Sequence, residues 1–141
     1  MKALNLIVAL LLLGVIAYSS KANATGLSRT SQLISESRLE LRLANLKDAE
    51  KYWRFGNEHL LRDDYKAAIA DFTKAIEINP EFAQAYLNRG VAYAFLQDYQ
   101  AAIADYTKAI EINPKLAPAY DNRGVVRGEL AQSFKYLFNL L

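Results

Sequence analysis

Hydrophobic and polar positions divide the chain into three regions with different patterns. Residues 3–18 are apolar except for Asn5, residues 25–48 hold a spaced series of aliphatic side chains, and residues 49–130 repeat one motif. These patterns predict an N-terminal targeting segment, a helix that follows it, and a helical repeat domain.

The first 24 residues have the layout of a secretory signal peptide. Lys2 precedes the apolar run, and the segment ends in an Ala-Asn-Ala motif whose small alanines suit a signal peptidase. We expect cleavage after Ala24, which removes residues 1–24, and export of the rest to the periplasm or cell envelope. The alternative is a membrane anchor formed by residues 3–18, although this run is shorter than the ~20 residues that a spanning helix needs.

The apolar residues between 25 and 48 follow no single period. They are Leu33, Ile34, Leu39, Leu41, Leu43 and Leu46. The alternation from Leu39 to Leu43 is typical of a strand, but Glu, Arg, Leu and Lys in the same stretch favour a helix. We expect residues 25–48 to form a linker and a helix that caps the domain that follows.

Residues 49–130 contain an internal repeat. The segment 64–86 reads DYKAAIADFTKAIEINPEFAQAY, and the segment 98–120 reads DYQAAIADYTKAIEINPKLAPAY. The two are identical at 18 of 23 positions and are offset by 34 residues. A period of this length is typical of helix-turn-helix units that stack on one another.

The repeat resembles the tetratricopeptide repeat (TPR) in its length and in its signature residues. These residues are Tyr52, Phe55, Gly56, His59, Ala68, Phe72, Ala75 and Pro80 in the first unit, Tyr86, Arg89, Gly90, Tyr93, Ala102, Tyr106, Ala109 and Pro114 in the second, and Tyr120, Arg123 and Gly124 at the start of a third. The resemblance implies an all-α TPR helix-turn-helix solenoid. It has two full repeats, 49–82 and 83–116, and a partial third repeat with an apolar tail at 117–141.

Each unit places a glycine inside its first helix, although glycine there costs up to ~1 kcal/mol relative to alanine. The three are Gly56, Gly90 and Gly124. We expect a side chain at these positions to collide with the second helix, at the small surfaces of Ala68 and Ala102. The large aromatic signature residues are then core residues rather than contacts for a cofactor.

Polar residues mark the expected ends of the helices. Asp64 and Asp98 are placed to cap the second helix of each unit, because a short carboxylate accepts hydrogen bonds from the free amides there. Asn79 and Asn113 each precede a proline at a repeat boundary. We expect these asparagines to cap the next helix and the prolines to lie in its first turn.

The C-terminal segment is apolar where a terminal repeat usually has a polar outer face. Its large apolar residues are Phe134, Leu137, Phe138, Leu140 and Leu141. We expect this tail either to fold irregularly over the third unit or to dock on another molecule.

The composition narrows the possible chemistry. The chain has no cysteine, which excludes disulfides, a cysteine nucleophile and thiolate metal sites. Its one histidine, His59, occupies a signature position, and the sequence holds no phosphate loop or metal-ligand motif. We therefore expect no catalysis, no cofactor and no metal. Lys2 and Lys21 lie in the first 24 residues, and the 15 remaining basic residues equal the 15 acidic ones, so the charge does not favour nucleic acid.

The resemblance also implies a binding surface. TPR solenoids grip extended peptides or partner helices on a concave surface formed by the first helix of each repeat. Helical spacing places seven residues of this chain there: Trp53, Asn57, Leu87, Asn88, Val91, Asp121 and Asn122. Amide side chains offer both donors and acceptors to a peptide backbone, and Trp53 offers a large apolar contact. The alternative is that these are ordinary solvated helix positions.

One TPR subclass, the carboxylate clamp, holds acidic peptide termini with two asparagines and three basic residues. Asn57 and Asn88 match the asparagines, but Trp53, Pro118 and Asn122 stand where the clamp has its basic groups. None of these three can make charge-assisted bonds to a terminal carboxylate. The resemblance does not extend to this ligand class.

Two functions follow as alternatives. The first is a non-enzymatic protein-interaction module outside the cytoplasm, which contacts the membrane only if its N-terminal segment is retained. The second is a structural or assembly subunit that forms a homo-oligomer, or joins a membrane complex, through its apolar tail. The chain is similar to TPR proteins common in cyanobacteria and other bacteria, and a cyanobacterial source would make the thylakoid lumen another expected location.

Overall fold

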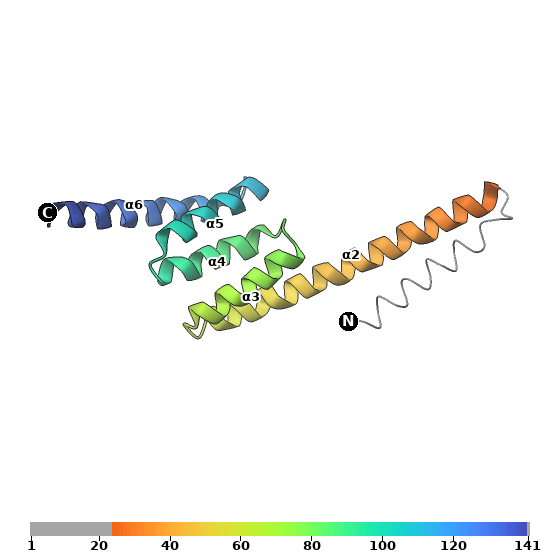
Figure 1. Ribbon diagram of the computed structural model, residues 1–141, viewed down its shortest axis with the longest axis horizontal. Helices are drawn as coiled ribbons and strands as arrows, with labels where there is room; N and C mark the ends of the chain where they lie inside the picture. The colour runs from red at the N-terminus through yellow and green to blue at the C-terminus, as the bar shows by residue number, and fades with distance from the viewer. Residues whose placement is uncertain (1–23, 141) are drawn as a thin grey trace. The chain divides into compact units, whose positions relative to one another are not determined.

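The computed structural model describes residues 24–140, and these residues form five helices (Figure 1). The helices are α2 (Ala24–Leu60), α3 (Tyr65–Ile78), α4 (Ala83–Phe95), α5 (Tyr99–Ile112) and α6 (Ala117–Asn139). The described part contains no strand, and none of its helices is long and apolar enough to cross a membrane. The signal peptide predicted for residues 1–24 lies outside the described residues, apart from Ala24.

The chain divides into two compact units, Met1–Leu43 and Ala44–Leu141. Residues 25–48 are helical and continue without a break into the first repeat as the N-terminal part of α2. Their aliphatic side chains are exposed: Leu33, Ile34, Leu39, Leu41, Leu43 and Leu46. The capping role of this segment stays a prediction.

In the unit Ala44–Leu141, the helices pack in chain order. α3 packs on α4, α4 on α5, and α5 on α6 (Figure 1). The C-terminal part of α2 and α3 form the first helix pair, α4 and α5 form the second, and α6 supplies the first helix of a third. The predicted all-α solenoid is therefore confirmed.

The turn inside each helix pair has the same geometry in both complete repeats. Asp63 (φ 57°) and Gln97 (φ 62°) adopt the left-handed conformation that ends the first helix. The next residue, Asp64 or Asp98, caps the second helix, because its carboxylate accepts a hydrogen bond at 3.2 Å from the backbone amide three residues later. Both predicted aspartate caps are confirmed.

The connection between repeats differs from its prediction. Asn79 and Asn113 end α3 and α5, and their side-chain oxygens accept hydrogen bonds from the amides two residues later, at 3.2 Å and 3.1 Å. The prolines lie in the turn, because the next helices begin only at Ala83 and Ala117. The expectation that asparagine caps the following helix is wrong, since its side chain closes the turn instead.

Aromatic rings occupy the space beside two of the helix glycines. A Cβ atom on Gly56 would lie 2.5 Å from Cε1 of Phe72, and a Cβ atom on Gly90 would lie 2.7 Å from Cε1 of Tyr106. Real Cβ atoms do not approach other atoms so closely. The predicted collision is confirmed at both positions, where an added Cβ would force the ring to shift.

The atoms nearest these glycines belong to the rings rather than to the predicted alanines. Ala68 and Ala102 are buried in the same clusters as Phe72 and Tyr106, but each lies one helical turn before the ring that meets the glycine. The alanines instead complete the packing around the rings. Spacing along a helix fixes which face is buried, but it does not show which side chain reaches across.

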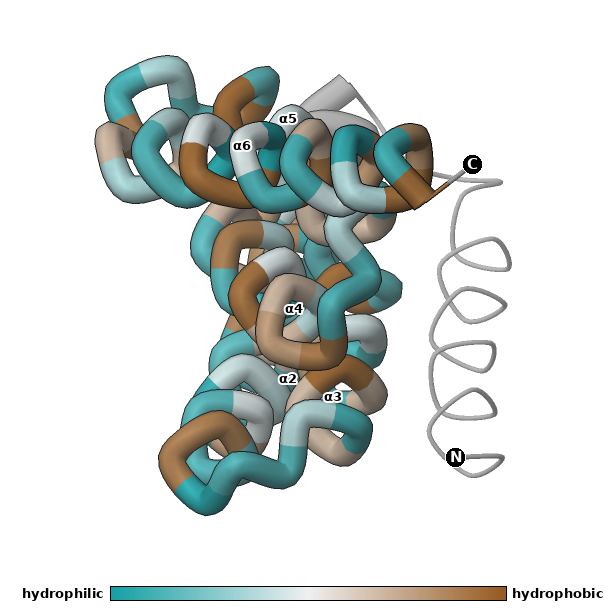
Figure 2. The backbone as a smooth tube through the Cα atoms, turned by 90° about the vertical axis from the view of Figure 1, so that its left-hand side faces the viewer, coloured by the Kyte–Doolittle hydropathy of each residue, from teal (hydrophilic) through white to brown (hydrophobic). Residues whose placement is uncertain are grey.

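The third glycine has no such neighbour. No atom of a neighbouring side chain lies within 4 Å of a Cβ built on Gly124, because α6 continues through the residues that would form a turn and a second helix. At the positions that form the turn in the complete repeats, Ala131 replaces the left-handed residue and Gln132 replaces the capping aspartate. Alanine is the strongest helix former, so the helix continues to Asn139. The tail is therefore a regular helix and does not fold irregularly over the third unit (Figure 2).

Tyr106 is the largest fully buried side chain, with 1% of its surface exposed. Burial, with a smaller contribution from the nearby carboxylate of Asp105, raises the pKa of Tyr106 to about 12. The folded state therefore holds the phenol proton more tightly than the unfolded state, in which the pKa is about 10.

Replacing Gly90 and Gly124 by alanine should have opposite effects on stability. Gly90→Ala should lower the free energy of unfolding by about 1–3 kcal/mol, because the new methyl group overlaps the ring of Tyr106. Within a single chain Gly124→Ala enters open space, so at protein concentrations where the chain is monomeric it should raise the free energy of unfolding by up to ~1 kcal/mol through better helix propensity. Urea unfolding of both variants checks this, and destabilisation of equal size would contradict it.

Tyr106→Phe should make the fold less sensitive to alkaline pH. Stability from the buried phenol is complete below pH ~10 and is lost as the pH rises to about 12, a loss of about 2–3 kcal/mol. Phenylalanine fits, because Phe72 occupies the equivalent position in the first repeat. Unfolding curves of the wild type and the variant between pH 9 and pH 12 measure the difference in stability. Equal losses of stability in the two proteins would show that Tyr106 is not the cause of the alkaline sensitivity.

Candidate partner-binding surface

The seven candidate binding residues lie on the first helices of the repeats. α2 carries Trp53 and Asn57, α4 carries Leu87, Asn88 and Val91, and α6 carries Asp121 and Asn122. The faces of α2, α4 and α6 that carry these residues are called the first-helix surface below. All seven lie in the unit Ala44–Leu141, so their relative positions are defined by the packing of one unit.

The structure brings Asn57 and Asn88 into direct contact. Nδ2 of Asn88 donates a hydrogen bond to Oδ1 of Asn57 at 2.6 Å, and both side chains are half-buried. This bond joins α2 to α4 across the repeat boundary. It leaves Oδ1 of Asn88 and Nδ2 of Asn57 without a hydrogen bond to another described residue, so each amide keeps capacity for a ligand.

Asn122 repeats the position of Asn88 one unit later. Asn57 of the first repeat bonds to Asn88. The residue equivalent to Asn57 in the second repeat is Val91, whose side chain has no polar atom to bond Asn122. Within the described residues, the half-buried Asn122 side chain makes no hydrogen bond. α6, the first helix of the third repeat, therefore presents an amide whose donor and acceptor groups are both unused.

Trp53 packs into the interior more than the sequence suggests. Its ring centroid lies 5.8 Å from that of Phe82, and it contacts the clusters around Phe72 and Ile76. Its Nε1 atom is buried without a hydrogen-bond partner. Truncation of Trp53 would therefore disturb the packing of α2, α3 and α4, and its predicted contact with a ligand stays a prediction.

The apolar members on α4 also contribute to the core. Leu87 and Val91 are half-buried and pack against the cluster that contains Tyr106 and Val126. Asp121, in contrast, is exposed. Apart from the buried Nε1 of Trp53, the polar side-chain atoms of these seven residues are thus those of the three amides and this one carboxylate.

A forked ion pair fixes the helix that carries Asn88. Nε and Nη2 of Arg89 donate to Oδ2 and Oδ1 of Asp105, each at 2.8 Å, and Nη1 donates to Oγ1 of Thr73 at 3.0 Å. The hydrogen bonds to Asp105 raise the pKa of Arg89. Bidentate pairs of this kind have a defined orientation, so the fork ties α4 to both α5 and α3. Arg89 is a TPR signature position, but no sequence pattern marked Asp105 as its partner.

His59, the one histidine of the chain, lies beside two carboxylates. Nδ1 and Nε2 of His59 lie 3.7 Å and 3.6 Å from carboxylate oxygens of Asp64 and Asp71, which is the geometry of a surface ion pair when the imidazole is protonated. No group of three or more potential metal ligands lies together in this part of the chain.

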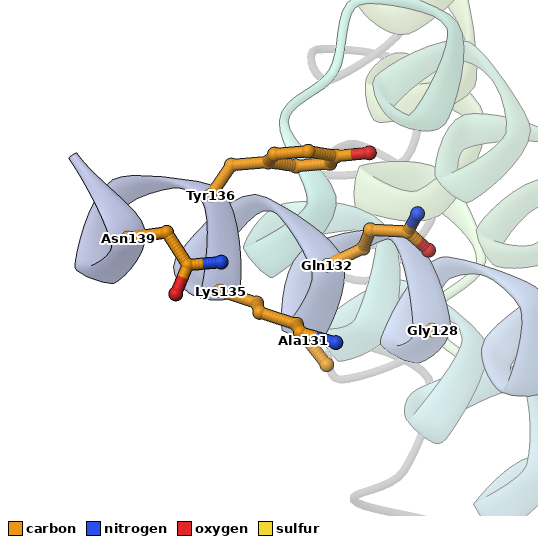
Figure 3. A pocket seen from close by; sticks show the side chains of 6 residues that line it. All are labelled: Gly128, Ala131, Gln132, Lys135, Tyr136 and Asn139. Atoms are coloured by element: carbon orange, nitrogen blue, oxygen red, sulfur yellow. The ribbon is translucent and has the colours of Figure 1, made fainter.

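A shallow hollow of about 530 Å³ lies away from the first-helix surface, along the C-terminal half of α6 (Figure 3). It is lined by Gly128, Ala131, Gln132, Lys135, Tyr136 and Asn139. All six residues come from one helix, and the hollow reaches close to the backbone at Gly128, which has no side chain, and at Ala131, which has only a methyl group. The hollow is a feature of an uncovered helix rather than an enclosed ligand site.

Comparisons with known proteins agree with this arrangement. Two family models match, described as "Tetratricopeptide repeat" over residues 83–116 and "TPR repeat" over residues 56–97. A comparison with curated protein sequences finds no match.

Solved TPR structures are similar in both sequence and fold. The Arabidopsis OM64 TPR domain is 33% identical with a TM-score of 0.61, over 62% of this chain and 73% of that domain. The TPR2B domain of yeast Sti1, solved in a complex with pHsp70, is 32% identical with a TM-score of 0.60, over 67% of this chain and 75% of that one. MamA is 30% identical with a TM-score of 0.59, over 61% of this chain and 50% of MamA. The chain therefore belongs to the tetratricopeptide-repeat proteins.

Proposed function

We propose that this protein is a non-enzymatic interaction module that binds a peptide or a partner helix on its first-helix surface. The observation that carries the proposal is the set of half-buried amides Asn57, Asn88 and Asn122, one on each first helix. Each has hydrogen-bonding capacity that the described residues do not use. The backbone of an extended peptide carries one hydrogen-bond donor and one acceptor per residue. A side-chain amide, which has both a donor and an acceptor, can bond to both of these groups.

The similar structures support a peptide as the ligand class. The TPR2B domain of yeast Sti1 forms a complex with pHsp70, and the second TPR of Spaghetti (RPAP3) is bound to the HSP90 peptide SRMEEVD. In this chain, Trp53, Pro118 and Asn122 replace the basic residues of a carboxylate clamp. We infer that its ligand is held through backbone hydrogen bonds and apolar contacts rather than through a terminal carboxylate.

We further propose that the module works outside the cytoplasm. The proposal rests on the sequence of residues 1–24, with their apolar run and Ala-Asn-Ala motif. N-terminal sequencing of the protein from its native cell envelope tests it. A first residue of Thr25 would support a cleaved signal peptide, whereas retention of Met1 would favour an anchor formed by residues 3–18.

Loss of one amide should weaken partner binding without affecting the fold. The full chain would capture its ligand from an extract of the source cells, and the affinity of the purified ligand would then be measured by calorimetry. Asn122→Ala should weaken binding about 2–10-fold, which corresponds to about 0.5–1.5 kcal/mol for one hydrogen bond. Asn122 makes no hydrogen bond to the described residues, so its loss should leave the melting temperature unchanged.

Gln100→Ala is the matched control, because Gln100 is an exposed amide on the second helix α5. It should bind as tightly as the wild type. Equal affinities for all three proteins would place the ligand elsewhere and refute the first-helix surface as the binding site.

A further inference from the structure

α6 carries a stripe of exposed residues that none of the described helices covers. Its members are alternately four and three residues apart, the spacing that keeps side chains on one face of a helix. They are Tyr120, Gly124, Arg127, Ala131, Phe134 and Phe138. The phenylalanines are 59% and 80% exposed, and a Cβ built on Gly124 would meet no atom within 4 Å. Below, these six residues are called the α6 stripe.

The C-terminal part of α6 reproduces the buried face of a second helix. In both complete repeats, an aromatic ring is followed by small or aliphatic residues three and four positions later. The three sets are Phe72, Ala75 and Ile76 in α3, Tyr106, Ala109 and Ile110 in α5, and Phe134, Leu137 and Phe138 in α6. Phe72 and Tyr106 pack on the glycines of the preceding first helices, and Ala75 and Ile76 lie in a cluster with Tyr52 and Trp53 of α2. The third set has the same pattern with larger side chains, but it is exposed.

The tail cannot cover Gly124 of its own chain. The glycine and the ring that meets it are 16 residues apart in both complete repeats, which leaves room for a turn. Gly124 and Phe134 are only ten residues apart, within one unbroken helix. At 1.5 Å per residue, Phe134 lies about 15 Å along the helix axis from Gly124. A ring that packs beside Gly124 must therefore come from outside α6 of the same chain.

We propose that the α6 stripe is covered by α6 of a second copy of this chain, in an antiparallel pair related by a twofold axis at Glu129. Gly124 and Phe134 lie five residues before and after Glu129, and Tyr120 and Phe138 lie nine residues before and after it. Each Phe134 then rests on Gly124 of the other copy, as Tyr106 rests on Gly90 within one chain. Each tail takes the place that a second helix has in the complete repeats. Such a contact is made twice by symmetry and closes on itself.

The charges beside the α6 stripe suit this arrangement. On the helix, Asp121 and Lys135 lie on the same flank of the stripe, and both are exposed. The same flanks meet in an antiparallel twofold pair, so each Lys135 lies near Asp121 of the other copy. Arg127 of one copy faces Ala131 of the other. The small alanine side chain leaves room for the arginine stem to pack while the guanidinium reaches water. The pair thus continues the first-helix to second-helix interface of the complete repeats.

The oligomeric state of the full chain tests this pairing, with two aromatic substitutions on α6 as the comparison. Phe134 and Tyr136 are similarly exposed, at 59% and 63%, but Tyr136 points to the opposite side of the helix. Sedimentation equilibrium should show a dimer for the wild type and for Tyr136→Asp, and a monomer for Phe134→Asp. A monomeric wild type would assign the stripe to a different protein and overturn the proposal, as would the same oligomeric state in both variants.

Gly124→Leu separates pairing from folding. Because open space surrounds this position within the monomer, the side chain should leave helix content unchanged while it blocks the seat of the partner's ring. The expected result is a folded monomer. A Gly124→Leu dimer of wild-type stability would show that the ring does not lie on this glycine.

The register can be measured by cross-linking, because the chain has no cysteine of its own. Residues 127 and 131 face each other across the proposed axis. Under oxidation, a mixture of Arg127→Cys and Ala131→Cys chains should yield mainly the mixed disulfide. Disulfides mainly between identical variants would indicate a parallel pair and contradict the antiparallel register.

Discussion

The contact between an aromatic ring and a helix glycine sets the spacing of every complete helix pair in this protein. Phe72 lies on Gly56 and Tyr106 lies on Gly90, each closer than any Cβ would permit. Because the rings are fully buried, the two helices of a pair must stay in close contact along their length. The Arg89 fork is made by the residue next to one of these glycines, so the polar and apolar contacts fix the same interface.

This spacing also determines where the polar side chains of the first helices lie. With both pairs closed, α2 and α4 are near enough for Asn57 and Asn88 to bond at 2.6 Å. The third repeat supplies a first helix, with Asn122 on it, but no ring to close on Gly124. The proposed ligand surface and the proposed pairing surface share only Asp121 on α6, so Asn122 remains available to a ligand when the α6 stripe is covered.

Much of this architecture can be predicted from the sequence, because the same pattern of residues occurs in both complete repeats. The 34-residue period predicts the fold class, and Asp64 and Asp98 are predictable as caps because their side chains act locally. Contacts between distant residues are harder to predict. Nothing in the local sequence shows that the ring of Tyr106, rather than the alanine one turn earlier, lies nearest the glycine. Asp105 comes within reach of Arg89 only when the two helices of the pair pack together. The helical position of Trp53 assigns it to the surface, although its ring is large enough to reach the interior.

A double-mutant cycle on Gly90 and Tyr106 tests most directly whether this contact sets the helix spacing. Free energies of unfolding would be measured for Gly90→Ala with Tyr106 present and with Tyr106→Val, which removes the ring atoms that the new methyl group would meet. The two sites should be coupled by about 1–3 kcal/mol. The alanine should destabilise the protein with tyrosine and be neutral or stabilising, by up to ~1 kcal/mol, with valine. An equal effect of the alanine in both backgrounds would contradict the account.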